Sequence, residues 1–81
     1  MDVDSVAEGL GVELSVLAPR DVLDSSLVGV VFRSGGLVCG YDVDLLRESL
    51  MSLNPSWDEE EASEWIAYNA VGRVAVLEVV L

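Results

Sequence analysis

Residues 56–72 read SWDEEEASEWIAYNAVG and have the pattern of one amphipathic helix with both ends marked. Ser56 suits the N-cap position, and Glu59, three residues later, completes a capping box. The acids of the first turn lie where the helix dipole favours negative charge. Gly72 follows the last periodic residue, at the position where a left-handed residue commonly ends a helix. The stretch therefore predicts a helix that begins after Ser56 and ends just before Gly72.

The two faces of this helix differ in chemistry. One face is largely apolar and is expected to pack on the rest of the protein. This face consists of Ala62, Trp65, Ile66, Asn69 and Ala70. The opposite face carries carboxylates flanked by aromatic side chains. Its residues, which are the candidate partner-binding residues, are Trp57, Glu60, Glu61, Glu64 and Tyr68.

Length and composition indicate a single domain over residues 1–81, in which residues 1–9 form a frayed turn or a short helix. Hydrophobic residues make up 52%, too many for a disordered chain despite the net charge of −11. No apolar run approaches the ~20 residues that cross a bilayer, and the acidic N-terminus lacks the basic start of a signal peptide. We therefore expect a soluble, cytoplasmic protein.

Catalytic and metal-binding residue types are scarce. The sequence has no histidine and no lysine, and its one cysteine, Cys39, lies in an apolar run that predicts a buried thiol. A nucleophile–base pair and an ordinary zinc site are therefore hard to assemble. Consecutive acids on a helix point in different directions, and no EF-hand spacing is present. We predict a non-enzymatic protein without cofactor or metal.

Charge indicates the kind of partner. Four arginines stand against 15 acids, so the surface repels nucleic acid and anionic membranes and favours a basic protein surface. A second explanation is that the acidity serves solubility alone, as expected for a GC-rich genome or a high-salt cytoplasm. Both explanations stay open at this point.

The segments around the helix predict an α+β fold. Strands are expected at residues 10–17, 27–33, 37–41 and 73–81. A turn at residues 34–36 joins the second and third strands into a hairpin, and Gly29 indicates a bulge. Asp42 or Asp44 caps a helix that runs to about Leu53, and Asn54-Pro55 ends it. The β-β-β-α-α-β order predicts a small antiparallel sheet packed on one face by a helical hairpin.

The last predicted strand is almost continuously hydrophobic, with Glu78 as its one charge after Arg73. This pattern is typical of a central strand or of an edge strand covered by a second subunit. It therefore also predicts a possible homodimer interface.

Three features occur together in residues 27–72. They are a glycine-containing strand, a Gly40-Tyr41-Asp42 step into a leucine-rich helix, and the acidic helix with Asn69 and Gly72. In these features the chain resembles a family of short phage and prophage proteins. It departs from the family in its first 26 residues, which are extra, and in the apolar strand that replaces a glycine-rich tail. The resemblance implies the cytoplasm of an infected bacterial or archaeal host, but no activity.

Charge and resemblance together predict a non-enzymatic phage protein that binds and inhibits a host nucleic-acid-handling defence protein. Anti-CRISPR and anti-restriction inhibitors that imitate DNA are the concrete version. Acids on neighbouring helical positions lie ~5–6 Å apart, which makes a phosphate-like array geometrically possible. The alternative is a phage accessory or structural protein that forms a homodimer through its last strand. Trp57 is either an interface anchor or a cover over the preceding helix.

Overall fold

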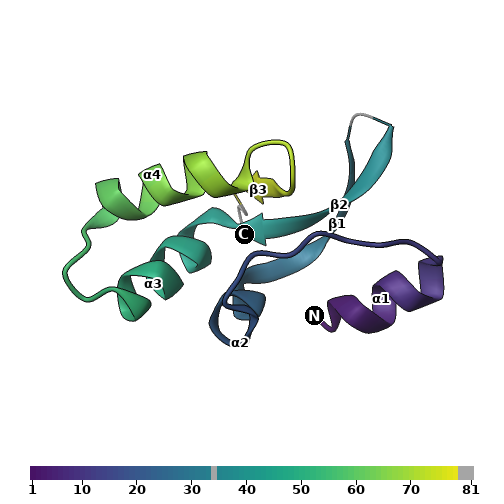
Figure 1. The fold of residues 1–81 in the computed structure, drawn as a ribbon, viewed down its shortest axis with the longest axis horizontal. Helices are drawn as coiled ribbons and strands as arrows, with labels where there is room; N and C mark the ends of the chain where they lie inside the picture. The colour runs from purple at the N-terminus through teal and green to yellow at the C-terminus, as the bar shows by residue number, and fades with distance from the viewer. Residues whose placement is uncertain (34, 79–81) are drawn as a thin grey trace.

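The computed structural model describes residues 1–33 and 35–78 and has an α+β fold (Figure 1). The helices are α1 (Val3–Leu10), α2 (Arg20–Leu23), the 3-10 turn η1 (Asp24–Ser26), α3 (Val43–Leu53) and α4 (Glu59–Ala70). The strands are β1 (Leu27–Arg33), β2 (Gly36–Asp42) and β3 (Ala75–Leu77). The predicted fold class is thus confirmed, and the first nine residues belong mostly to a helix.

The hairpin of β1 and β2 confirms the clearest strand prediction. The two strands pair antiparallel, and the register shifts between Leu27 and Gly29, which is the expected bulge. In the turn, Gly35 has a φ of 79°, a conformation that glycine adopts at little cost. Ser34, the first residue of the predicted turn, lies outside the described residues.

The strand predicted at residues 10–17 is wrong. Helix α1 continues through Leu10, and Gly11 caps it in a left-handed conformation with a φ of 68°. The chain then runs extended, and no ladder pairs it with another described strand. The apolar residues instead reflect packing, because Leu14, Val16 and Leu17 face the core. The buried N–H of Leu17 donates to the hydroxyl oxygen of Tyr41 at 2.8 Å, which replaces a ladder bond.

The last strand differs from its prediction in length and direction. β3 spans three residues, and it pairs parallel to β2, with Gly40 opposite Ala75 and Asp42 opposite Leu77. The sheet is therefore mixed, not antiparallel. Parallel neighbours need a long crossover, and α3 with α4 supplies one. In the order β1-β2-β3, β3 is an edge of the described sheet, and residues 79–81 of the prediction lie outside the described residues.

The helical pair α3 and α4 forms as the sequence predicts, with one correction. Asp42 is the N-cap of α3, and its Oδ1 accepts the N–H groups of Asp44 and Leu45 at 2.9 and 3.1 Å. Helix α4 begins two residues later than expected, because Asp58 and not Ser56 is its N-cap. The two helices lie antiparallel and in contact (Figure 1).

The core lies where α2, η1, α3, α4 and the extended segment converge on β2. Its completely or almost completely buried large side chains are Leu17, Leu23, Cys39, Tyr41, Leu46 and Leu50. Burial raises the pKa values of the Cys39 thiol and the Tyr41 hydroxyl, because the charged forms of both groups are poorly solvated there. The prediction of a buried thiol is confirmed.

Candidate functional site

The N-terminal half of α4 concentrates negative charge at the surface. A third of the 15 acids lie within residues 58–64. These acids, all exposed, are Asp58, Glu59, Glu60, Glu61 and Glu64. The capping carboxylate of Asp58 accepts the N–H of Glu61 at 2.9 Å, so the start of the helix fixes where the acids project.

The arginines that form ion pairs lie elsewhere. Within residues 1–33 and 35–78, the ion pairs join Arg20 to Asp4 and Asp24, and Arg47 to Asp44. No ion pair among these residues involves an acid of α4. The charge of the helix is therefore left uncompensated, although arginines neutralise acids in other parts of the protein.

The two other arginines also face other neighbours. Arg73 donates to the carbonyl oxygen of Val16, with the two atoms 3.5 Å apart. Arg33 lines a separate hollow with Gly72 and Val74. Internal cations are thus directed away from the acidic half of α4 in the part of the chain that the structure describes.

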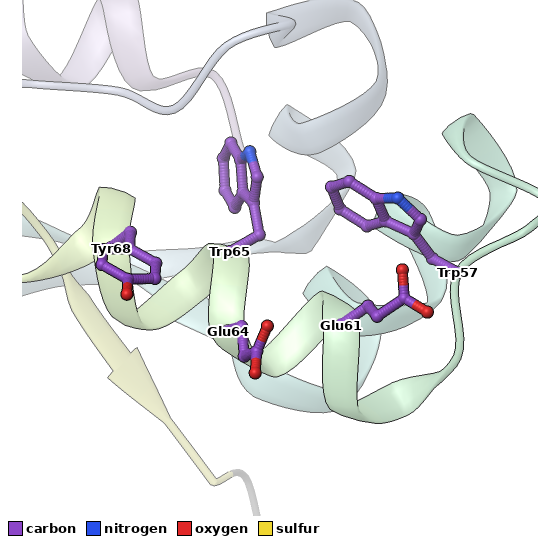
Figure 2. A pocket seen from close by; sticks show the side chains of 5 residues that line it. All are labelled: Trp57, Glu61, Glu64, Trp65 and Tyr68. Carbon is purple, nitrogen blue, oxygen red and sulfur yellow. The ribbon is translucent and has the colours of Figure 1, made fainter.

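A hollow of about 230 Å³ runs along the acidic side of α4 (Figure 2). Its lining residues are Trp57, Glu61, Glu64, Trp65 and Tyr68. In the view of Figure 2 the Trp57 indole extends toward that of Trp65, and Glu61 lies beside Trp57. Four of the five predicted partner-binding residues therefore meet in one site. Glu60 is exposed on the same helix but does not line this hollow.

The position of Trp65 differs in part from the sequence prediction. It was assigned to the core face, but it lines the hollow and is only partly buried against the core. Part of the signal was present in the sequence, because Trp65 follows Glu61 at four-residue spacing within the helix. Trp57 likewise packs partly against the core and lines the hollow. Its two predicted roles, interface anchor and cover over the preceding helix, therefore do not exclude each other.

The remaining aromatic residue is the most accessible part of the site. Tyr68 is 87% exposed. The next residue, Asn69, donates from its Nδ2 to the carbonyl oxygen of Trp65, one turn earlier, at 2.8 Å. Its partner is therefore a carbonyl of its own helix. The Asn69 amide thus bonds the backbone of the residue that carries one of the two indoles.

Comparison with protein-family models, with curated proteins and with solved structures found no match to this chain. None of the helices that the structure describes is long and apolar enough to cross a membrane. The same residues contain no group of three or more His, Cys, Asp or Glu side chains that could hold a metal ion.

Proposed function

We propose that this protein is a non-enzymatic phage inhibitor that presents the acidic side of α4 to a basic nucleic-acid-handling protein of its host. The proposed class is that of anti-restriction or anti-CRISPR inhibitors that act as DNA mimics. The observation that carries the proposal is the exposed, uncompensated acids of residues 58–64 beside the hollow. By occupying a basic groove, such a surface excludes DNA or RNA from it.

Two physical properties support recognition by this surface. A net charge of −11 accelerates encounter with a basic partner, and this steering weakens as salt screens the charges. The surface is also rigid, because α4 is anchored by the buried side chains of Ala62, Ile66 and Ala70. A preorganised surface loses little conformational entropy on binding, and aromatic side chains beside charges are effective anchors.

The test uses the immobilised protein and a nuclease-treated bacterial lysate, at ~50 mM and ~500 mM salt. We expect nucleic-acid-binding proteins to be retained at low salt and released at high salt. The captured protein, once purified, should release labelled DNA or RNA when the free inhibitor is added. Retention without such competition contradicts the proposal.

A matched pair of variants shows whether α4 is the site. Glu61→Arg with Glu64→Arg should abolish capture. Glu8→Arg with Glu13→Arg is the control, since both positions are exposed and lie outside α4. Each pair changes the net charge by +4, from −11 to −7. Equal losses from the two pairs would show that total charge, and not this surface, determines capture.

A second candidate function is assembly through β3, in a phage accessory or structural protein whose charge serves only solubility. In the described sheet β3 pairs with β2 on one side only, and its Val76 and Leu77 are half-buried. An apolar edge strand is a natural place for a second copy to pair. Sedimentation equilibrium tests this function. A dimer that Val76→Lys dissociates supports it, and a monomer at high concentration rejects it.

A further inference from the structure

The lining of the α4 hollow combines two kinds of group that attract the same ligand chemistry. Three of its side chains are aromatic, and the other two are the carboxylates of Glu61 and Glu64. Aromatic faces attract cations through the negative charge of their π-systems, and carboxylates attract them directly. No cationic side chain lines the hollow.

We propose that this hollow binds the guanidinium group of one arginine side chain of the partner. The inference rests on the proposed function and specifies what the acidic surface recognises. A guanidinium is planar and weakly hydrated, so it stacks on an indole while its N–H groups donate in the plane to carboxylates. A lysine ammonium is a compact and strongly hydrated charge, which loses more solvation when it stacks.

The size of the hollow also fits one side chain. Sites for drug-sized molecules usually enclose roughly 300–1,000 Å³. The volume here is about 230 Å³, which is below that range. An uncharged apolar side chain would fit as well, but it would bury Glu61 and Glu64 without giving them a partner, which is unfavourable. Size and charge together therefore select a cationic side chain.

The protein carries its own reporter for this interaction. Both of its tryptophans, Trp57 and Trp65, line the hollow. A guanidinium stacked on an indole should change the intrinsic fluorescence of the whole protein. We would titrate the protein with a hexa-arginine peptide at low salt and compare hexa-lysine and hexa-citrulline peptides. We expect a saturable change with hexa-arginine, affinity about 5-fold or more above that for hexa-lysine, and no binding of hexa-citrulline.

Two double variants separate the hollow from the general charge of α4. Glu61→Gln with Glu64→Gln removes the two carboxylates of the hollow. Glu59→Gln with Glu60→Gln removes two exposed carboxylates of the same helix that do not line it. Both proteins have a net charge of −9, since −11 + 2 = −9. We expect the first pair to weaken hexa-arginine binding by about 10-fold and the second by no more than about 3-fold.

The aromatic contribution is tested at Tyr68. Its side chain is 87% exposed, so Tyr68→Ala leaves the packing of α4 intact. The half-buried tryptophans are left unchanged, because truncating them would disturb the core. We expect Tyr68→Ala to reduce the preference for hexa-arginine over hexa-lysine, at unchanged melting temperature.

Three results would overturn the inference, and they differ in what else they reject. Equal affinities for the arginine and lysine peptides reject the hollow but leave the acidic surface as a binding site. Equal effects of the two glutamine pairs do the same. Failure of both cationic peptides to bind at low salt rejects the hollow and the proposed function together.

Discussion

Acidic side chains serve different purposes in two regions of this protein. Beside α2, carboxylates of Asp4 and Asp24 converge on the guanidinium of Arg20 at 2.9 and 3.0 Å. On α4, the acids of residues 58–64 form no ion pair within the described residues. The Arg20 cluster ties α1 to the α2–η1 turn, which lies 16 residues further along the chain. The acids of α4 have no such cationic neighbour among the described residues.

The difference shows that charge content alone does not identify a binding surface. Where an arginine lies beside them, acids form contacts that stabilise the fold. The hydrogen bonds of Arg20 to Asp4 and Asp24 also hold the pKa of Arg20 above its usual value. Where compensation is lacking and aromatic side chains gather, the same residue type forms a candidate site. Exchanging or removing these features by substitution therefore tests the difference between the two regions.

Tyr68→Arg would place a cationic side chain beside the acids of α4. An arginine at this position lies four residues after Glu64, which is the favourable order for a helical ion pair. The new side chain should occupy the hollow itself. We expect hexa-arginine binding, measured by tryptophan fluorescence, to fall about 100-fold, which corresponds to about 2.7 kcal/mol. Stability should change by less than about 0.5 kcal/mol.

The control for this variant is Val71→Arg. Val71 is 76% exposed and does not line the hollow, and the substitution makes the same change in net charge. We expect it to weaken binding by no more than about 3-fold. If the two variants bind equally, the hollow has no special role.

Tyr41→Phe should affect the fold and not the α4 site. The substitution leaves the buried N–H of Leu17 without its acceptor, now 2.8 Å away. Leaving a buried donor unsatisfied costs about 1–3 kcal/mol. Urea unfolding should show a loss of this size, with hexa-arginine affinity unchanged. Tyr68→Phe is the control, since that hydroxyl is exposed, and it should leave stability unaltered.

Arg20→Gln should lower stability by less than Tyr41→Phe does. The substitution removes both ion pairs of the cluster, so the Asp24 carboxylate loses its cation. The Oδ1 atom of this carboxylate is already buried without a hydrogen-bond partner. We expect a lower melting temperature by thermal circular dichroism and no loss of peptide binding. Arg33→Gln, at an exposed residue outside the ion pairs of the described chain, should leave the melting temperature unchanged. Weaker peptide binding by Arg20→Gln would contradict the separation of the two regions.

Local signals in the sequence predicted much of the fold. The hairpin, the Asp42 cap and the stop at Asn54-Pro55 each depend on a few consecutive residues, and the structure has all three. The Ser56 cap was a local error, since Asp58 caps α4 instead, but the two errors among the strands depend on distant partners. In residues 10–17 the apolar side chains near the end of the segment cover the core, although the backbone joins no sheet. The direction of β3 follows from the crossover through α3 and α4. A strand pattern shows which side chains are buried but not what the backbone bonds to.

The site was predicted in part for a related reason. Helical spacing is fixed, so the predicted partner-binding residues that lie within α4 and line the hollow share one stripe. Trp57 precedes the cap of α4, so helical spacing does not place it, and it reaches the hollow from the connection between α3 and α4. Trp65 was misplaced because ~100° per residue sets it between the stripe of Tyr68 and that of the buried Ile66. A side chain as large as tryptophan reaches both. Glu60 lies on the other flank of the stripe, outside the hollow.

The smallest predicted effect concerns pH at the start of α1, within reach of the Arg20 cluster. The hydroxyl of Ser5 donates to Asp2 at 2.8 Å and its N–H at 3.2 Å, and these bonds hold the pKa of Asp2 below 3.8. Since the folded state favours the carboxylate, its contribution is complete above 3.8 and is lost as pH falls through the lower, folded pKa.

Asp2→Asn should therefore destabilise the protein slightly at neutral pH, and this difference from the wild type should shrink as pH falls below 3.8. Asparagine can still cap the helix, so the difference reports mainly the charge. Urea unfolding of both proteins at several pH values from ~2 to ~6 measures it. A difference that stays constant over this range would show that the carboxylate of Asp2 contributes only as a neutral acceptor.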